Sequence, residues 1–376
     1  MQTRMQPPHY LLRSLFTVLL LCSSQLGWTN DDNRLQLPAG FSIERLNFSV
    51  PNARQMALTP NGTLIVGTRR RGKVYAVPDA MSDAEPAVID LLSDLRMPSG
   101  ITVHDGDLYI GALNQVIKVT DIDKHTHADA PTTVVADNLP DKTHHGWKYL
   151  KFGPDDQLYV PVGAPCNICL SDDPRFASLL RMNPATGTTT IWAHGIRNTV
   201  GFAWHPRTGE LWFSDNGRDM MGDDVPPEEI NISTEAGQHF GYPFVHAHDI
   251  DDPEFGDHNM RSKWQFTGPE VEIQAHSAAL GITFYDHTQF PETYRDALFV
   301  AEHGSWNRSS KVGYQVSVIK QTDSGELSYQ PFVSGWLQGE EDWGRPNDVL
   351  VTPTGALLIA DDKQGIIYRV SYAPEA

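Results

Sequence analysis

Short alternating strands separated by polar turns recur along the whole chain. Each copy consists of a turn rich in Pro, Gly, Asp or Asn, followed by a strand in which apolar and polar residues alternate. The six copies are TPNGTLIVGT from Thr59, VHDGDLYIGA from Val103, GPDDQLYVPVG from Gly153, HPRTGELWFSD from His205, YRDALFVAE from Tyr294 and TPTGALLIADD from Thr352. Because period-2 alternation bounded by such turns is typical of strands, the pattern predicts an all-β chain.

The spacing of the six copies predicts the architecture. Their anchor leucines lie 44, 50, 53, 87 and 59 residues apart, at Leu64, Leu108, Leu158, Leu211, Leu298 and Leu357. Periods of roughly 40–50 residues with several short strands indicate β-propeller blades, which bury both faces against their neighbours. We therefore expect one domain over residues 35–374, a six-bladed β-propeller. The region near 41–47 should close the ring by pairing with the last blade.

The interval of 87 residues indicates a long loop insertion around residues 216–274. It contains NGRDMMGDDVPPEEIN, GQHFGYPF and HAHDIDDPEFGDH, none of which is strand-like. Unpatterned loops of this length are usually functional, so we expect part of one blade and loops of the functional face here. The acidic run 249–257 does not fit the EF-hand spacing and is interpreted as a solvated loop.

Residues 1–28 have the pattern of a secretory signal peptide. Arg4 and Arg13 supply positive charge, and LFTVLLLC from Leu15 to Cys22 is an apolar centre too short to span a bilayer. We expect a periplasmic or secreted protein without a membrane span. In an oxidising compartment the two remaining cysteines, Cys166 and Cys169, should form a disulfide.

Composition restricts the choice of partners. The 376 residues include 29 Lys and Arg against 47 Asp and Glu, a formal net charge of −18. Nucleic-acid binding requires a basic face, so no nucleic-acid partner is expected. No dinucleotide, Walker, zincin or serine-hydrolase motif is present, which leaves nucleotide cofactors and those two hydrolase classes without support.

Loops that precede three of the predicted inner strands carry groups suited to chemistry. The first ends in the histidine pair at His145, just before the predicted strand Trp147–Phe152, and histidine is the side chain most easily used as a base near neutral pH. The other two are HGIRN with Arg197 and WGRPND with Arg345. In a propeller these loops converge on one channel mouth, where two arginines suggest a bound anion. Alternatively, the histidines are solvated and each arginine pairs with a nearby aspartate, for which Asp219 and Asp348 are available.

Four runs of the chain resemble the soluble pyrroloquinoline quinone (PQQ)-dependent sugar dehydrogenases. They are HHGWKYLKFGPDDQLYVPVG, GIRNTVGFAWHPRTGELWFSDNGRD, EEINISTEAGQHFGYPF and GRPNDVLVTPTGALLIADD. The segments PNARQMAL and PCNIC are more similar to the L-sorbosone dehydrogenase-like branch. The resemblance covers residues 37–372. It implies a six-bladed propeller that holds PQQ and Ca²⁺ at the channel mouth, oxidises a sugar or sugar-derived aldehyde by hydride transfer to the quinone, and passes electrons to an external acceptor.

The same resemblance implies roles for individual residues. The general base of the family stands seven residues before the Phe of the F-G-P-D-type turn, which is His145 here. Arg197 would stabilise the negative oxygen that develops in the reaction, and Asn198 would position the cofactor. The cofactor contacts near the last blade fall on Arg345 and Asn347.

The carbonyl groups that hold calcium in the family fall on Gly217 and Arg218. Arg218 replaces a proline of the family, and Asn347 replaces an arginine. A carbonyl ligand survives a side-chain change, whereas the second replacement removes a cation that Arg218, Arg308 or Lys311 would have to supply. These departures leave two alternatives open: a propeller that binds a sugar or a protein without redox chemistry, and a lactonase-type metal hydrolase.

Overall fold

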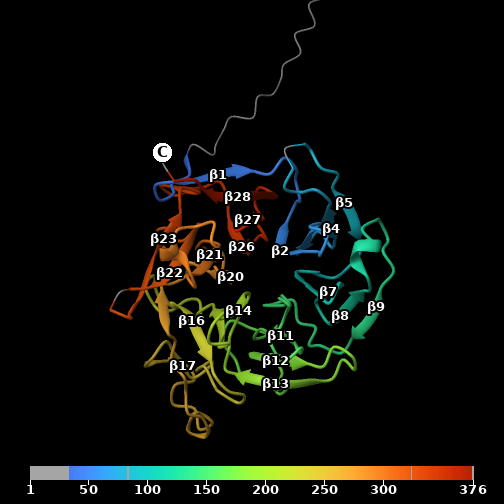
Figure 1. The fold of residues 1–376 in the computed structure, drawn as a ribbon. Helices are drawn as coiled ribbons and strands as arrows, with labels where there is room; N and C mark the ends of the chain where they lie inside the picture. The colour runs from blue at the N-terminus through green and yellow to red at the C-terminus, as the bar shows by residue number, and fades with distance from the viewer. Residues whose placement is uncertain (1–33, 83, 323, 375–376) are drawn as a thin grey trace, which may run out of the picture. The chain divides into compact units, whose positions relative to one another are not determined.

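The computed structural model describes residues 34–82, 84–322 and 324–374. Six four-stranded antiparallel sheets follow one another around a central axis, as Figure 1 shows in the view along that axis. The prediction of an all-β, six-bladed propeller is confirmed. The expected signal peptide lies outside the described residues. No described helix is long and apolar enough to cross a membrane.

The first three blades each use four consecutive strands, with the innermost strand first. Blade one contains β2 (Ala53–Leu58), β3 (Leu64–Thr68), β4 (Val74–Val77) and β5 (Ile89–Leu92). Blade two contains β6 (Gly100–His104), β7 (Asp107–Ala112), β8 (Gln115–Val119) and β9 (Thr133–Ala136). Blade three contains β10 (Lys151–Phe152), β11 (Leu158–Val162), β12 (Ser178–Met182) and β13 (Thr189–His194).

The last three blades include the insertion and the ring closure. Blade four contains β14 (Phe202–Trp204), β15 (Leu211–Asp215), β16 (Glu228–Ser233) and β19 (Val271–Ile273). Blade five contains β20 (Ala279–Phe284), β21 (Leu298–Glu302), β22 (Gln315–Gln321) and β23 (Leu327–Val333). Blade six contains β26 (Pro346–Val351), β27 (Leu357–Asp361), β28 (Ile366–Tyr372) and β1 (Phe41–Arg45).

The remaining elements are short. They are the two-stranded pairs β17 (Val245–His246) with β18 (Ile250–Asp251) and β24 (Leu337–Gln338) with β25 (Glu341–Asp342), and the 3₁₀ turns η2 (Ile122–Lys124), η3 (Arg261–Lys263) and η4 (Glu292–Tyr294). The long insertion therefore supplies the two outer strands of blade four, and residues 234–270 form an excursion between them. β17, β18 and η3 lie in that excursion.

The ring closes through the pairing of β1 with β28, which Figure 1 shows as a blue strand beside a red one. The register runs antiparallel from Phe41 opposite Tyr372 to Arg45 opposite Tyr368. The predicted closure of the ring by the first strand region is thus confirmed. The closing strand is held by packing as well as by hydrogen bonds, because the ring of Phe41 lies 4.8–5.2 Å from four other aromatic rings: Phe290, Tyr294, Phe332 and Tyr372.

Neighbouring blades share their cores through the alternation that the sequence displays. All six anchor leucines are buried, none with more than 2% of its surface exposed. On β3, Leu64 packs in a cluster with Leu358 of blade six, whereas the next residue, Ile65, packs with Ile101 of blade two. Successive strand residues point to opposite faces, so both faces of each blade are covered.

One predicted strand is much shorter than expected. The sequence predicts a strand over Trp147–Phe152, but β10 contains only Lys151 and Phe152. Upstream of it, the backbone of Leu150 exchanges hydrogen bonds with the side-chain amide of Gln55, at 2.7 and 2.9 Å. The ladder between β10 and β11 thus begins at Lys151, four residues later than the alternation suggests.

The closing strand offers a test of ring stability. We expect Phe41→Ala to lower the free energy of unfolding by roughly 2–3 kcal/mol, less than a fully buried phenylalanine costs, because Phe41 is only half-buried. Urea denaturation measures this change. Ser42→Ala, at an exposed position of the same strand, is the control and should change stability little. Equal stability of the two variants would contradict a role of the Phe41 cluster in closing the ring.

Candidate functional site

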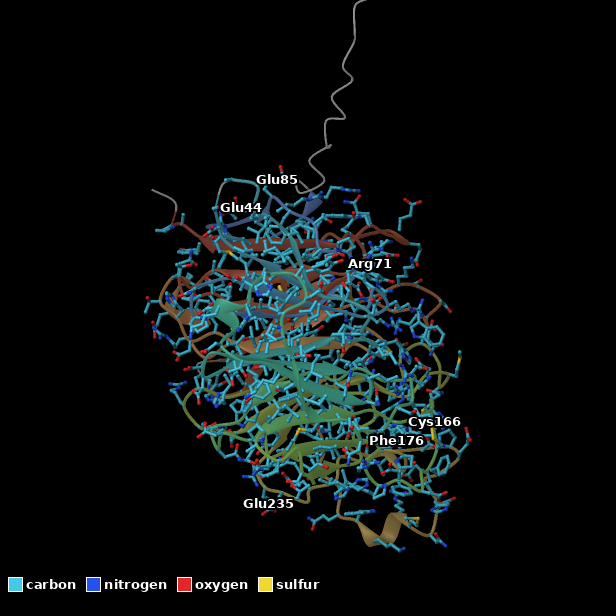
Figure 2. All side chains as sticks on the ribbon, turned by 90° about the vertical axis from the view of Figure 1, so that its right-hand side faces the viewer. Glu44, Arg71, Glu85, Cys166, Phe176 and Glu235 are labelled. Carbon is cyan, nitrogen blue, oxygen red and sulfur yellow. A yellow bond between two sulfur atoms is a disulfide. The ribbon has the colours of Figure 1, made fainter. Side chains whose placement is uncertain are left out.

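The end of the ring where the innermost strands begin has a cavity of about 280 Å³. Neighbouring strands run antiparallel, so the start of each innermost strand and the end of the next strand meet at this end. Figure 2 accordingly shows Arg71 and Cys166, which follow the second strands of blades one and three, on the same side of the molecule. The lining comes from blades one, three, four, five and six: Arg54, Arg69, His145, Trp147, Arg197, Asn198, Asn216, Gly217, Asp219, Glu228, His276, Ala278, Leu280, His303, Trp306 and Arg345.

A second cavity, of about 480 Å³, lies at the opposite end of the channel. Its walls include the last residues of two innermost strands, Leu58 of β2 and Val351 of β26. It contains no arginine and none of the residues expected from the sequence to carry chemistry. The smaller cavity is therefore the candidate functional site.

His145 enters the cavity wall as a neutral imidazole. Its Nδ1 lies 3.0 Å from the carbonyl oxygen of Ala164, and a carbonyl can only accept, so Nδ1 carries the proton and Nε2 keeps its lone pair. Burial lowers the pKa of His145 to about 2, with help from the charge of Arg197 and from the neighbouring His144. The side chain is thus an unprotonated acceptor over the whole ordinary pH range.

The backbone at His145 requires a special local arrangement. Its φ is 49°, in the left-handed region that side chains other than glycine rarely adopt. The neighbouring Gly163 makes room for it, because a Cβ at position 163 would lie 2.5 Å from the Cβ of His145 and 2.8 Å from its carbonyl oxygen. Glycine at 163 therefore lets the loop before β10 pack against the end of β11.

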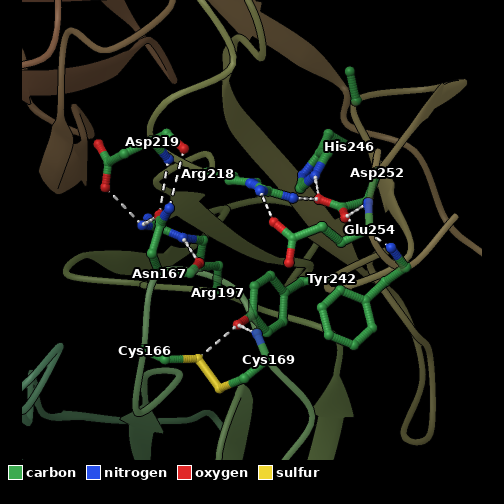
Figure 3. A network of polar contacts seen from close by, with 12 residues as sticks. Cys166, Asn167, Cys169, Arg197, Arg218, Asp219, Tyr242, His246, Asp252 and Glu254 are labelled. Atoms are coloured by element: carbon green, nitrogen blue, oxygen red, sulfur yellow. Dashed lines mark hydrogen bonds and ion pairs between the residues drawn. A yellow bond between two sulfur atoms is a disulfide. The ribbon is translucent and has the colours of Figure 1, made fainter.

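Four hydrogen bonds hold the guanidinium group of Arg197, and Figure 3 shows its partners Asn167 and Asp219. Its Nε donates to the carbonyl of Asn167 at 2.9 Å, and Nη1 donates to the carbonyl of Asn216 at 3.0 Å. Its Nη2 reaches the side-chain oxygen of Asn167 at 2.7 Å and the carboxylate of Asp219 at 2.9 Å. The sequence alternative in which Arg197 pairs with a nearby aspartate is therefore correct, and the pair forms part of the cavity wall.

Asp215 positions the loop that carries the catalytic candidates of blade four. Its carboxylate accepts the backbone N–H groups of Arg197, at 2.8 Å, and Asn198, at 2.6 Å. Burial raises the pKa of Asp215 to about 7. The side-chain oxygen of Asn198 is buried and has no hydrogen-bond partner among the described residues, which leaves it free to contact a ligand.

Blade one contributes two further arginines that the sequence analysis did not single out. Arg54 pairs with Asp362 at 2.8 Å, and the same carboxylate contacts His303 at 2.8 Å. Arg69 makes no ion pair with any described residue, and its buried Nε has no partner there. Instead, its guanidinium lies 4.0 Å from the centre of the Trp147 ring.

The positive charges around Arg69 favour the binding of an anion. Burial, together with the charges of Arg54, Arg70 and Arg345, lowers the pKa of Arg69 to about 10 against the attraction of Asp362. The group is still cationic at neutral pH. Like charges at close range repel, so a bound anion would stabilise the cluster.

The side chain of Arg345 lines the cavity and forms no ion pair with an aspartate among the described residues. Its Nε donates to the carbonyl of His303 at 2.9 Å, and Nη2 donates to the carbonyl of Gly304 at 2.7 Å. The alternative in which Arg345 pairs with Asp348 is wrong, because the buried Asp348 accepts from the backbone N–H of Met56 instead. Together with Arg54, Arg69 and Arg197, Arg345 makes four guanidinium groups around one cavity in a chain of net charge −18.

The structure does not bring Asn347 or the Arg218 side chain into the lining, in contrast to the sequence analysis. Asn347 is buried between blades six and one, where its amide donates to the carbonyls of Ala53 and Ala360 at 3.0 and 3.3 Å. Arg218 turns away from the cavity and pairs with Asp252 and Glu254. Asp252 is thus buried and paired, so the interpretation of the run 249–257 as a solvated loop is wrong at this residue, whereas Asp249, Asp251, Glu254 and Asp257 are exposed.

Arg308 and Lys311, which were also suggested to supply the cation lost at position 347, form ion pairs outside the cavity. Arg308 contacts the carbonyl of Asp223 and pairs with Asp224 at 3.0 Å, and Lys311 pairs with Asp342 at 2.6 Å. The cations that the cavity holds in addition to Arg197 and Arg345 come from blade one. Their signal in the sequence is the pair of segments PNARQMAL and TRRRG, which place Arg54 at the start of the innermost strand β2 and Arg69 just after the second strand β3.

Oxygen donors gather on the blade four side of the cavity. The carbonyl oxygens of Gly217 and Arg218 accept no hydrogen bond from the described residues. Asp219 and Glu228 line the same wall. Glu228 accepts the N–H of Gly217 at 2.8 Å, and burial raises its pKa to about 8. No group of three or more His, Cys, Asp or Glu side chains among the described residues is arranged to hold a metal ion.

Cys166 and Cys169 are joined by a disulfide just behind Arg197, with 6.2 Å between their Cα atoms. The loop they close contains only two residues, one of which is Asn167. The N–H of Cys169 donates to the hydroxyl of Tyr242 at 3.0 Å, a contact visible in Figure 3. The disulfide therefore shapes the segment that holds the guanidinium of Arg197.

Comparison with known proteins identifies the family. The family model described as TrAA12-like matches residues 35–373, nearly the whole described chain. The chain belongs to the TrAA12-like family. This TrAA12-like protein is 32% identical to an uncharacterized protein of Borreliella burgdorferi over 95% of its own length and 96% of that protein. It is 23% identical to the pyrroloquinoline quinone-dependent sugar dehydrogenase of Hypocrea jecorina, with 96% of each chain covered.

Solved structures share the fold of this TrAA12-like protein. The iodide structure of the Trichoderma reesei family AA12 enzyme superimposes with a TM-score of 0.74 at 18% identity, covering 90% of this chain and 98% of that one. The holo form of the pyranose dehydrogenase PQQ domain of Coprinopsis cinerea gives a TM-score of 0.72 at 17% identity, with 90% and 97% covered. At these identities the likeness establishes the common propeller fold.

The low pKa of His145 has a consequence for stability. An ordinary histidine in the unfolded chain titrates near 6.5. Between that value and about 2 the unfolded state binds the extra proton, so folding stability falls as the pH falls through this range. We expect His145→Asn, whose amide can still donate to Ala164 and tolerates a left-handed φ, to lose less unfolding free energy than the wild type between pH 7 and pH 4.

Denaturant titrations at several pH values measure this difference. A comparison of the two proteins at pH 8 supplies the baseline, because neither state protonates this imidazole there. If the two stability curves ran parallel from pH 8 to pH 4, the imidazole would not be held neutral in the folded protein.

Proposed function

We propose that this protein is a PQQ-dependent dehydrogenase that oxidises a sugar or a sugar-derived aldehyde. The observation that carries the proposal is the cavity of about 280 Å³ in which four arginines and two tryptophans surround a neutral histidine. Guanidinium groups bind carboxylates in bidentate pairs, and tryptophan faces pack against flat rings. A planar aromatic quinone with several carboxylates matches both features.

Two orphaned polar atoms support the fit of PQQ to this cavity. The Nε of Arg69 and the side-chain oxygen of Asn198 are buried without partners among the described residues, on different sides of the lining. Such atoms are costly to leave unsatisfied, so a polar ligand between them would stabilise the folded protein. Arg54, Arg69 and Arg345 would hold carboxylates of the cofactor, and Asn198 would fix its orientation. When bound, PQQ supplies a two-electron acceptor.

Calcium belongs to the same proposal. The carbonyl oxygens of Gly217 and Arg218 would bind the ion, and Asp219 and Glu228 stand beside them in the wall. Oxygen donors of this kind suit Ca²⁺. The side chain of Arg218 does not oppose the ion, because its charge is directed to Asp252 and Glu254.

Within the cavity, His145 and Arg197 would carry the chemistry of this chain. The lone pair on Nε2 of His145 would accept the proton of a substrate hydroxyl, which is the task of a general base. Arg197 would place a fixed positive charge beside the oxygen that becomes negative. Trp306, 68% exposed at the cavity, offers an apolar face to a sugar ring at the entrance.

The substrate class is supported by the relatives. The Hypocrea jecorina relative is a PQQ-dependent sugar dehydrogenase, and the Coprinopsis cinerea neighbour is a pyranose dehydrogenase domain with PQQ. We include keto-aldehydes such as sorbosone because the sequence also resembles that branch. An external acceptor would take up the electrons, and export through the N-terminal segment remains part of the proposal.

Arg69 provides a test of cofactor binding. We expect Arg69→Gln to weaken PQQ binding by about 10- to 100-fold, because a charge-assisted contact to a carboxylate is lost. Fluorescence titration with PQQ in the presence of calcium measures the dissociation constant. Arg71→Gln removes the same charge from an exposed position two residues away and should bind PQQ as the wild type does. Equal affinities of the two variants would remove Arg69 from the cofactor site.

His145 provides a test of the chemistry. We expect His145→Asn to lower the turnover number by about 10²–10⁴-fold while PQQ binding changes little, because the base is lost and the cationic walls are retained. Dye reduction with a panel of aldoses and keto-aldehydes measures turnover. Near-normal turnover of a folded, PQQ-loaded variant would exclude His145 as the base.

The same panel separates the alternatives. Wild-type protein that binds PQQ and calcium but reduces no dye with any sugar would favour a binding propeller. Hydrolysis of lactones without any quinone would favour the lactonase-type alternative. Sugar-dependent dye reduction that requires PQQ would support the dehydrogenase.

A further inference from the structure

We propose that Asn167, held in place by the Cys166–Cys169 disulfide, is the residue that positions Arg197 for the reaction. The inference rests on the proposed function, because it assumes that Arg197 faces the bound quinone. It concerns a residue that lies outside the cavity lining and acts through another side chain.

Asn167 makes two of the four hydrogen bonds that hold the guanidinium of Arg197. Its backbone carbonyl accepts from Nε at 2.9 Å, and its side-chain oxygen accepts from Nη2 at 2.7 Å. The other two acceptors are the carbonyl of Asn216 and the carboxylate of Asp219, both on the loop after β15. The guanidinium is thus held between loops of blades three and four.

This arrangement leaves one N–H of Arg197 unused. A guanidinium has five N–H donors: one on Nε and two on each terminal nitrogen. The Nε donor, both Nη2 donors and one Nη1 donor are engaged by the described residues. The second donor of Nη1 has no such partner, and Arg197 lines the cavity. The four bonds therefore leave a single N–H of Arg197 available to a ligand in the cavity.

The amide of Asn167 is itself fixed in orientation. Its side-chain oxygen also accepts the backbone N–H of Asp219 at 2.9 Å, and its Nδ2 donates to the carbonyl of Asp219 at 3.0 Å. Both ends of the amide are therefore defined by the neighbouring backbone. An apolar side chain at position 167 would leave the N–H and the carbonyl of Asp219 unpaired, together with one Nη2 donor of the guanidinium.

The disulfide fixes the backbone around Asn167. Cys166 and Cys169 bracket the two residues of the loop, and Tyr242 from the blade four insertion contacts both cysteines: it accepts the N–H of Cys169 at 3.0 Å and lies 3.5 Å from the sulfur of Cys166. Figure 3 shows these contacts continuing into the Asn167–Arg197 pair. A backbone held on both sides keeps the carbonyl acceptor of Asn167 in place. Preorganisation of this kind is what electrostatic catalysis requires.

Substitution of Asn167 tests the role. We expect Asn167→Leu to lower the turnover number by about 10- to 100-fold and the affinity for PQQ by about tenfold, with a smaller change in KM for the sugar. Asn167→Asp keeps the acceptor oxygen for Arg197 but loses the Nδ2 donor to the carbonyl of Asp219, so it should recover part of the wild-type turnover. The double variant Cys166→Ser with Cys169→Ser keeps the side chain of Asn167 and releases its backbone. The hydrogen bond from Nε of Arg197 to the carbonyl of Asn167 should weaken, so turnover should fall by roughly several-fold.

Asn183→Leu is the matched control. Asn183 also accepts backbone N–H groups within a turn of blade three, but that turn lies at the opposite end of the strands. Thermal unfolding, PQQ affinity and the separate values of kcat and KM are measured for each protein. Should Asn167→Leu fail to fold, the double serine variant and Asn167→Asp carry the test.

The outcomes distinguish the two proposals. Failure of the wild type and of Asn183→Leu to bind PQQ would reject the proposed function itself. If both bind PQQ and oxidise sugar, then wild-type turnover and affinity in Asn167→Leu, or in a folded double serine variant, would overturn the role of Asn167. Loss of turnover in Asn167→Leu with recovery in Asn167→Asp would support it, because a purely structural defect would not be repaired by a carboxylate.

Discussion

The pairing of β1 with β28 is the constraint on which the whole structure depends. It joins strands from opposite ends of the described chain, and the Phe41 cluster packs behind it. No single blade could build the cavity, since its walls come from five of the six blades. Because the blades share their cores, a shift in the ring closure would move arginines from blades one and six relative to His145 of blade three. The interactions that stabilise the closed ring therefore also determine the geometry of the site.

The cavity concentrates positive charge in an acidic protein. Arg54 and Arg197 are balanced by carboxylates, whereas Arg69 and Arg345 contact an aromatic ring and backbone carbonyls, respectively. Burying unpaired cations is unfavourable, so such an arrangement is expected where a ligand supplies the missing negative charge. The neutral His145 beside it is an acceptor that no proton occupies at ordinary pH. An anionic cofactor and a hydroxyl substrate are the pair of ligands that this combination suits.

Much of this could be predicted from the sequence, and the rest depends on contacts that a local pattern does not display. Strand alternation predicted the blades, and the need of a propeller to close its ring predicted the pairing of the first strand region with the last blade. The loop positions placed His145, Arg197 and Arg345 near one another. Arg54 was missed because an irregularity between Ala53 and Met56 decides which way the side chains of β2 point.

The side chains of Asn347 and Arg218 were expected at the cavity and lie elsewhere for the same reason. Asn347 faces the junction of blades six and one, because its amide finds two carbonyls there. Arg218 finds its partners more than thirty residues away, in an insertion whose path the sequence does not indicate. Resemblance to a family assigns a role to a position in the sequence. The direction in which a side chain points follows from the charges and polar groups packed around it.

Calorimetric titration of the purified protein with PQQ, with calcium present and after its removal by a chelator, tests most directly whether the cavity binds this cofactor. We predict one site per chain at micromolar or tighter affinity, with binding weakened strongly when calcium is removed. Absence of binding at micromolar PQQ with calcium present would contradict the account, and the four arginines would then have to serve a different anion.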